Sequence, residues 1–430
     1  MDDAPTQTAE QHRAERRYDA EIQRNLTRNF VVHLIHGMLG QTGFRLLTAP
    51  TFLPAYVLML SGSDLAVGAA LSLQALGMAL TPLIGANLIE HRSRVLPMGF
   101  ITGGAMRLSV LGIALAGLVL PPPWALGAIF FWLTLFGLFQ GMQGVIFNFL
   151  MSKVIPVSKR GRLTGLRNFL AGITAAAVAY VGGELLLGDD PGVTGYSYTF
   201  VLAFVLTMCG LGSLAFMKEP EPPTVRPRAG LRQRLAEIPA LLRADPAFTR
   251  YFVARALATT GRMALPFYIV YAGASMQLSG SNLGILTVAF TLAGTVSNLA
   301  WGSIADRRGF RLVFLLSIAV WVASTLLLIA TGGLLMSVAV FIGIGAAFQG
   351  FQHASINMTL EFGHRDDLPV RIGIANSSSE LAGAFGPLLG GAIAHTFGYP
   401  VLFYTSVAFL LAGGLMVAAL VPEPRYRNTA

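Results

Sequence analysis

Cysteine, lysine and charge of either sign are scarce in this chain of 430 residues. The single cysteine, Cys209, excludes an intrachain disulfide framework and a metal site built from several cysteines. Charged residues make up 12% of the chain, against about 25% in a soluble domain, whereas hydrophobic residues make up 54% and the mean hydropathy is +0.63. These values predict a polytopic membrane protein and exclude a string of soluble domains.

The patterns that catalysis and bound cofactors require are also missing. The sequence contains no glycine-rich nucleotide loop, no grouping typical of a catalytic triad and no cluster of metal-ligating side chains. We therefore predict that the chain is not an enzyme, that it needs no cofactor or metal ion, and that ATP does not drive its activity.

Long apolar runs fill most of the chain. A helix needs about 20 apolar residues to cross a bilayer, and twelve segments qualify: 29–60, 65–89, 95–119, 124–155, 163–187, 198–216, 249–274, 282–305, 312–330, 333–361, 371–396 and 401–420. The sequence thus predicts an all-α membrane protein with two six-helix bundles at 29–216 and 249–420. A linker at 217–248 joins them, and 1–28 and 421–430 form tails.

Basic residues divide the loops between these spans into two classes. Lys and Arg gather in the tails, in the linker and in the loops 90–94 and 306–311, whereas 61–64, 188–197 and 397–400 contain none. Cytoplasmic loops carry the excess of Lys and Arg, so both termini are predicted to be cytoplasmic. The net charge of +9 then reflects topology, and we predict no nucleic-acid partner.

The choice of basic residues and the composition of the N-terminal tail indicate which membrane holds the protein. Only three of the 30 basic residues are lysine, and with abundant Ala, Gly and Pro this favours a bacterium with GC-rich DNA, hence the bacterial inner membrane. The tail 1–28 has no apolar core and is not expected to be a signal peptide.

Within the linker, apolar residues at helical spacing (Leu231, Leu235, Ile238 and Leu242) fit an amphipathic helix on the inner leaflet or, equally, a solvated connection.

The two halves of the chain repeat each other. Ser61-Gly-Ser-Asp-Leu65 recurs as Ser279-Gly-Ser-Asn-Leu283, and Phe139-Gln-Gly-Met-Gln143 recurs as Phe348-Gln-Gly-Phe-Gln352. The loop that begins at Glu90 matches the one that begins at Asp306, and Gly182-Gly183 matches Gly390-Gly391. Matches that keep their order indicate a duplicated six-helix unit.

This plan resembles that of the major facilitator transporters, whose two six-helix halves are parallel repeats. The stretch Gly302-Ser-Ile-Ala-Asp306-Arg307-Arg308-Gly309-Phe-Arg311 is similar to the signature loop of that superfamily, although the family usually has its better copy between spans 2 and 3. The run Gly386-Pro387-Leu-Leu-Gly390-Gly391 resembles a motif of proton-antiporting drug exporters. Those exporters carry it in span 5, whereas here it lies in span 11.

The resemblance implies that spans 1, 4, 7 and 10 line a central cavity, and deep polar residues fall on these spans. Their side chains are the predicted solute contacts: Gln41, Arg45, Gln140, Gln143, Arg255, Arg262, Gln349 and Gln352. Arg45 and Arg262 occupy corresponding places in the repeat, an arrangement similar to that of organophosphate–phosphate exchangers. Because Arg binds carboxylate and phosphate through a bidentate fork, we expect an anionic solute. The alternative for the arginines is structural bonding, and the glutamines equally fit bonds between helices.

The remaining candidates concern coupling and gating. Glu380 in span 11 and His353 in span 10 are the predicted proton-coupling groups, although Glu380 fits a permanent ion pair nearly as well. Because the resemblance places a cytoplasmic gate at the signature loop, Asp306, Arg307, Gly309, Arg311 and Glu90 are the predicted gate residues.

Taken together, these patterns predict a monomeric secondary transporter that moves a small organic anion by alternating access, with protons as a second substrate. One alternative is proton-driven efflux of amphipathic drugs or lipid-like metabolites. Another, of a different class, is a membrane scaffold or solute sensor that does not transport.

Overall fold

The computed structural model describes residues 4–89, 91–222, 242–243, 245–330, 332–362 and 368–423. For residues 4–12, 83, 157, 360–361 and 368–380 it describes the backbone alone. Most of the predicted linker and all but the first three residues of the C-terminal tail lie outside the described residues.

The described part of the chain is helical and contains no strand. Its elements are α1 (Ala4–Thr48), α2 (Phe52–Ser61), α3 (Asp64–Leu80), α4 (Pro82–Ile89), α5 (Leu96–Val119), α6 (Pro122–Val154), α7 (Val157–Gly182), the π-helix η1 (Gly183–Leu187), α8 (Val193–Ser213), the 3₁₀-helix η2 (Leu214–Phe216), α10 (Pro246–Thr260), the 3₁₀-helix η3 (Gly261–Ala264), α11 (Phe267–Ser275), α12 (Gly280–Arg308), α13 (Phe310–Ala330), α14 (Leu334–Glu361), α15 (Leu368–Phe397) and α16 (Tyr399–Leu420).

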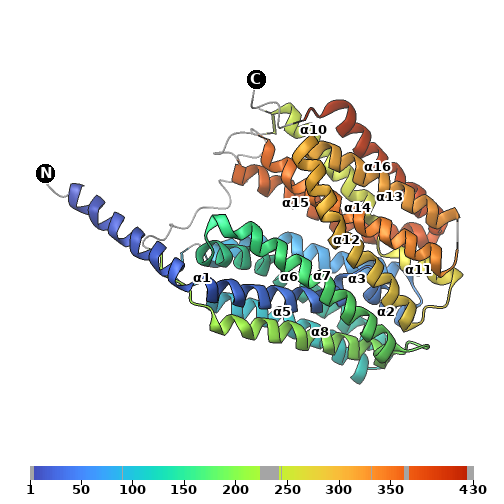
Figure 1. The fold of residues 1–430 in the computed structure, drawn as a ribbon. Coiled ribbons are helices and arrows are strands. Elements are labelled where there is room, and N and C mark those ends of the chain that lie inside the picture. The colour runs from blue at the N-terminus through green and yellow to red at the C-terminus, as the bar shows by residue number, and fades with distance from the viewer. Residues whose placement is uncertain are drawn as a thin grey trace.

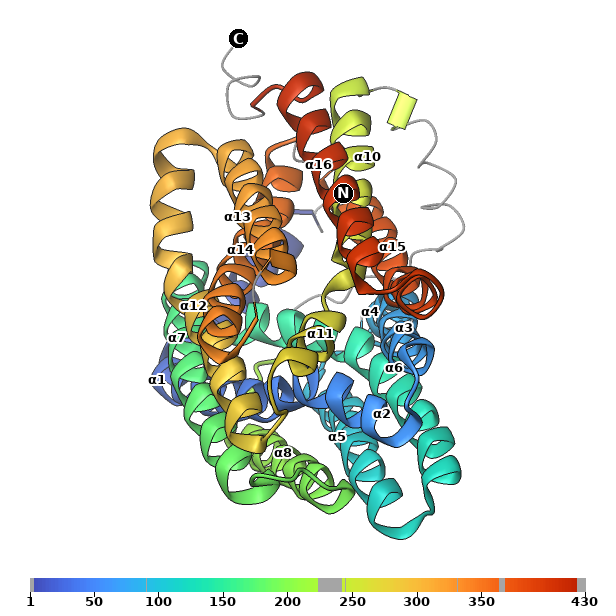
Figure 2. The same cartoon turned by 90° about the vertical axis from the view of Figure 1, so that its right-hand side faces the viewer.

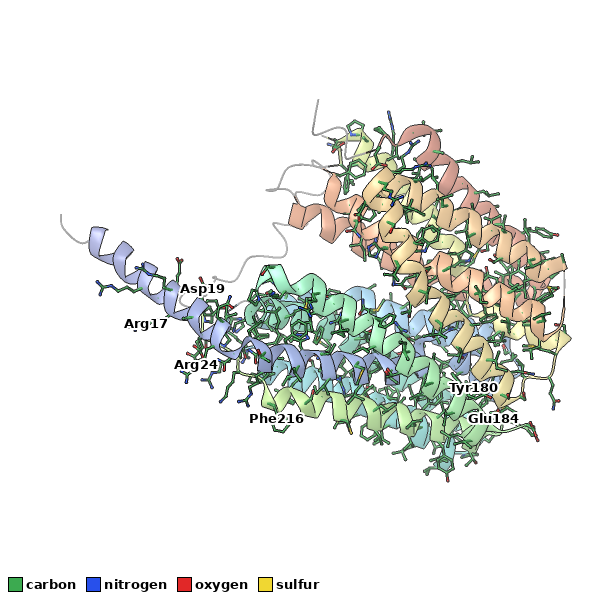
Figure 3. All side chains as sticks on the ribbon, in the orientation of Figure 1. Arg17, Asp19, Arg24, Tyr180, Glu184 and Phe216 are labelled. Carbon is green, nitrogen blue, oxygen red and sulfur yellow. The ribbon has the colours of Figure 1, made fainter. Side chains whose placement is uncertain are left out.

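These elements form twelve spans in two six-helix bundles, one from α1–α8 and one from α10–α16 (Figure 1). Nine helices in the described residues are long and apolar enough to cross a membrane unaided. The other three spans are α3 with α4, α10 with α11, and α15. The predicted all-α fold with twelve transmembrane helices is therefore confirmed. Before its span, α1 projects from the first bundle and carries Arg17, Asp19 and Arg24 into the open (Figure 3).

Spans 1 and 7 are broken helices, although the sequence predicts each as one continuous segment. In span 1, α1 ends at Thr48 and α2 begins at Phe52, with Pro50 between them. In span 7, α10 gives way to η3, and Pro266 precedes α11. Proline cannot donate the backbone hydrogen bond that would continue a helix. The breaks lie at corresponding places in the repeat, three residues beyond Arg45 and around Arg262 itself.

The two bundles meet at one end only (Figures 1 and 2). We call this end the loop face, because the turns near Gly62, Gly188 and Gly398 lie there; the opposite end, which carries the N-terminal helix, is the terminal face. At the loop face α3 packs on α15 and α7 packs on α12. Tyr399 Oη donates to Asp64 Oδ1 at 2.6 Å, and the backbone N–H of Leu388 donates to Ser72 Oγ at 2.9 Å. The two bundles diverge toward the terminal face.

Glycines make this contact close enough for backbones to touch. A Cβ on Gly183 would lie 2.3 Å from the carbonyl oxygen of Gly280, and one on Gly391 would lie 2.6 Å from that of Asp64. The Gly-Pro run in span 11 belongs to the same contact, since a Cβ on Gly68 would lie 2.2 Å from the Pro387 oxygen. Small residues allow helix backbones to approach in membranes, so these glycines set the distance between the bundles.

A buried ion pair ties the end of span 6 to spans 3 and 4 at the terminal face. Glu219 accepts hydrogen bonds from the backbone N–H groups of Val95 and Leu96 and pairs with Lys153 Nζ at 2.5 Å. The side chains of Lys153 and Glu219 are 6% and 4% exposed. Close by, Arg94 pairs with Glu221 at 2.8 Å, but both of these side chains are more than half exposed.

We expect Lys153→Met to destabilise the protein far more than Arg94→Ala. The first change leaves a buried carboxylate without its cation, which costs about 3–5 kcal/mol. The second removes an exposed pair, whose contribution is at most about 1 kcal/mol. Thermal unfolding of the two purified variants measures the difference. Equal unfolding temperatures would contradict a structural role for the Lys153–Glu219 pair.

Candidate functional site

Among the described residues, the larger of two adjoining cavities near the centre of the protein lies between the bundles and has a volume of about 440 Å³. Both bundles supply its walls. The first contributes α1, the break that follows α1, and α7, and the second contributes α12, α14 and Leu265, which lies in the break of span 7 between η3 and α11. The lining residues are Gln41, Arg45, Thr48, Ala49, Pro50, Asn168, Leu265, Phe290, Thr291, Gly294, Thr295, Asn298, Gly345, Phe348 and Gln349. Eight of these have polar side chains, so the cavity suits a polar solute better than a purely apolar one.

Arg45 brings the only formal charge among these lining residues. It lies 17 residues after Arg28 and 16 before Ser61, so at 1.5 Å per residue roughly 26 Å of α1 precedes it and a similar number of residues follows it to the end of span 1. Within the described residues its guanidinium makes no hydrogen bond or ion pair. Its side chain is partly buried at the cavity wall, and taking such a charge fully out of water without a partner would cost several kcal/mol. Among the described residues, the cavity therefore presents a positive charge near the middle of span 1 that no carboxylate of the lining pairs with.

Arg262 lines a second, smaller cavity of about 170 Å³, together with Gln74, Met78 and Pro387. The two cavities share Thr48, Ala49, Pro50 and Leu265 as a common wall. The guanidinium of Arg262 lies over the ring of Phe348, 5.2 Å from its centroid, and Phe348 also lines the larger cavity. In this conformation the two predicted arginines thus line adjoining cavities, and Phe348 contacts Arg262 on one side while it lines the cavity of Arg45 on the other.

Of the predicted glutamines, Gln41 and Gln349 line the larger cavity. Gln41 Nε2 donates to Asn168 Oδ1 at 3.0 Å, which joins spans 1 and 5 at the cavity wall. Gln143 instead accepts a hydrogen bond from Thr102 Oγ1 at 2.7 Å and is buried between spans 3 and 4. That bond between helices is the alternative that the sequence left open.

The other predicted contacts also lie away from the two cavities. Arg255 is buried in the second bundle, where it donates to Thr359 Oγ1 at 3.2 Å. Gln140 and Gln352 are partly buried but line neither cavity. Arg107, which is buried in span 3, donates to the backbone oxygens of Thr207 and Gly103 at 2.6 and 2.7 Å, so it holds spans 3 and 6 together.

The predicted coupling groups are not brought to the cavity by any described contact. His353 is exposed, and its ring stacks at 6.0 Å on Phe310, the first residue of α13. The side chain of Glu380 lies outside the described residues, so its predicted roles stay predictions.

The signature loop lies at the terminal face, between α12 and α13. Gly309 has φ +84°, which favours glycine, and the carboxyl group of Glu423 lies directly against it. Arg311 donates to the backbone oxygens of Val417 and Ala418, at the end of α16, whereas Asp306 and Arg307 are exposed. Glu90, the counterpart of Asp306 in the first bundle, lies outside the described residues.

Sequence reasoning missed the contribution of spans 5 and 8 to the site. Asn168 lies in α7, inside the predicted span 163–187 but not among the predicted solute contacts, and Phe290 and Asn298 lie in α12. The signal that could have found Asn298 is its polarity, since it is a carboxamide within an apolar span. Which face it presents depends on the packing of α12 against α7 and α14.

Two six-helix bundles around a polar cavity are the architecture of a known protein family, and the sequence of the chain matches that family. The model of the Major Facilitator Superfamily matches residues 30–268 and 251–430. This chain belongs to the major facilitator superfamily. The predicted family membership is therefore confirmed, and the chain is a multi-pass membrane protein.

Three proteins that are similar to this superfamily member are distant from it in sequence. The chain is 27% identical over 151 residues to the uncharacterized MFS-type transporter Rv1250 of Mycobacterium tuberculosis, and the match covers 35% of the chain and 26% of that protein. A variant of the nucleoside transporter NupG has a TM-score of 0.72 at 15% identity, covering 91% of this chain and all of that one. The xylose transporter XylE from E. coli has a TM-score of 0.68 at 13% identity, covering 92% and 97%. At such identity these structures establish the fold alone.

Proposed function

We propose that this superfamily member is a secondary transporter that moves a small organic anion across the membrane by alternating access between its two bundles. The observation that carries the proposal is Arg45, a central cation that has no partner among the described residues and lines a polar cavity between the bundles. An anionic solute would supply the negative charge, and its carboxylate or phosphate would supply two oxygens that accept hydrogen bonds from the guanidinium.

The proposed orientation follows from the basic loops. With both termini cytoplasmic in a bacterial inner membrane, the loop face is periplasmic, and the bundles are in contact on that side. The conformation described above is then inward-open. We also propose that Asp306, with Arg307, Gly309, Arg311 and Glu90, closes the terminal face in the opposite state, and that Glu380 or His353 couples transport to protons.

Counterflow in proteoliposomes is the test of this proposal. The matched panel is succinate, glucose and choline, which are anionic, neutral and cationic solutes of small size. We expect binding and exchange of anions in preference to the other two classes. Preference for choline would contradict the anion proposal, and tight binding without exchange would favour a solute sensor over a transporter.

A further inference from the structure

The larger cavity offers hydrogen-bond acceptors that no described residue satisfies. The side-chain oxygen of Asn298 is buried and accepts no hydrogen bond in the described part of the chain. A buried acceptor that is left without a donor costs about 1–3 kcal/mol. A solute that brings an O–H group to Asn298 would recover this cost.

Two threonines add to the acceptor character of the cavity wall. The hydroxyl of Thr48 donates to the Phe44 oxygen at 2.9 Å, and the hydroxyl of Thr295 donates to the Thr291 oxygen at 2.8 Å. A hydroxyl has one hydrogen, so both oxygens retain only lone pairs for a solute. Because Gln41 uses its amide group as a donor to Asn168, it too offers an oxygen.

Donor and acceptor groups are thus unevenly distributed over the cavity. Arg45 supplies positively charged donors, and the oxygens of Asn298, Thr48, Thr295 and Gln41 supply acceptors. None of the lining residues in the described part of the chain is Asp or Glu, so none of these residues offers a carboxylate to an ammonium group, which Arg45 would repel. Hydroxyl groups satisfy the acceptors without adding charge.

The aromatic residues suggest the shape of the solute. The rings of Phe290 and Phe348 lie 5.9 Å apart and are tilted by 46°, and both line the cavity. They form an apolar surface beside the polar groups, against which the C–H face of a saturated ring can pack. Gly294 and Gly345 allow α12 and α14 to pack closely beside these rings, since a Cβ on Gly345 would lie 2.2 Å from the Phe290 backbone oxygen.

We propose that the solute is a hydroxylated organic acid whose carboxylate binds Arg45 and whose hydroxyl groups donate to Asn298 and the neighbouring oxygens. This inference rests on the proposed transport of an anion and adds the second chemical requirement, hydroxyl donors on the same molecule.

Three probes of one size separate the two requirements. D-Glucuronate has a six-membered ring, a carboxylate and hydroxyls; D-glucose lacks the carboxylate, and cyclohexanecarboxylate lacks the hydroxyls. Calorimetric binding to the purified full chain, followed by counterflow, is the measurement. We expect glucuronate to bind at least about tenfold more tightly than either of the others, the ratio that 1.4 kcal/mol supplies.

Each alternative outcome overturns a different part of the reasoning. If cyclohexanecarboxylate binds as tightly as glucuronate, the hydroxyl requirement is wrong and the anion proposal stands. If glucose binds as tightly as glucuronate, the anion proposal is wrong and the hydroxyl requirement survives in a neutral solute. Binding of none of the three overturns the inference.

Variants assign the effect to the cavity. Asn298→Leu is expected to reduce the preference for glucuronate over cyclohexanecarboxylate to about one, because the buried acceptor is gone. Thr48→Val, at an exposed site that tolerates the change more easily, is expected to reduce it several-fold. Asn148→Leu is the control, since Asn148 is exposed on α6 and lines neither cavity. An unchanged preference in both cavity variants would overturn the inference.

Discussion

Replacing Arg45 with alanine is expected to abolish recognition of anions while both bundles stay folded. Removal of one partner from a desolvated charge pair costs about 2–5 kcal/mol in binding, and 3 kcal/mol corresponds to a roughly 150-fold weaker Kd. Folding is spared because Arg45 makes no hydrogen bond or ion pair with the described residues. Calorimetry with the best-bound anion measures the change in Kd, and thermal unfolding checks the fold.

Lysine variants test whether geometry matters as well as charge. Arg45→Lys keeps the charge and loses the planar fork, so we expect a smaller loss of about tenfold. Arg262→Lys should affect counterflow more than binding, because Arg262 lines the adjoining cavity in this conformation. Arg92→Ala is the matched control, since Arg92 is exposed at the terminal face. Wild-type affinity in both lysine variants, or a cationic transported solute, would make the drug-type alternative the better reading.

Gly183→Val is expected to stop transport, whereas Gly182→Val is expected to leave it nearly unchanged. Both glycines have helical backbone angles, so neither position needs glycine for its own conformation. A Cβ on Gly183 would lie 2.3 Å from the Gly280 oxygen, but one on Gly182 would meet nothing within 4 Å. Overpacking of this kind costs about 1–3 kcal/mol, which at its upper end changes the ratio of closed to open loop face roughly 150-fold.

Counterflow and accessibility together distinguish a gating effect from misfolding. A cysteine introduced at the loop face of a Cys209→Ser background should react faster in the Gly183→Val protein, and thermal unfolding should match that of Gly182→Val. If both valine variants transport equally well, the glycine contact does not control closure.

The sequence predicts the spans of this fold well because the length of an apolar run is a local property. The start of α5 lies within one residue of its prediction, and α13 ends at the predicted Ala330. The breaks in spans 1 and 7 were not predicted, even though Pro50 and Pro266 were visible, because a proline can kink a membrane helix without ending it.

The candidate site was predictable only in part. Gln41, Arg45 and Gln349 line the larger cavity as expected, because a charged or amide group deep in a span has few other places to go. Gln143 instead accepts a hydrogen bond from Thr102 within the first bundle. Asn298 lines the cavity from span 8, which the family resemblance did not include among the cavity helices. Helical spacing groups residues on a face, but the rotation of each helix is decided by packing with its neighbours.

The composition of the loop-face contact also bears on the energy needed to reverse the transporter. Its hydrogen bonds, such as Tyr399 to Asp64 and Leu388 to Ser72, contribute about 0.5–1.5 kcal/mol each. Moving a two-state equilibrium from 1:99 to 99:1 takes about 5.5 kcal/mol of differential binding. The differential binding of one solute is therefore large enough to offset several hydrogen bonds of this size, so we expect solute binding to contribute directly to opening of the loop face.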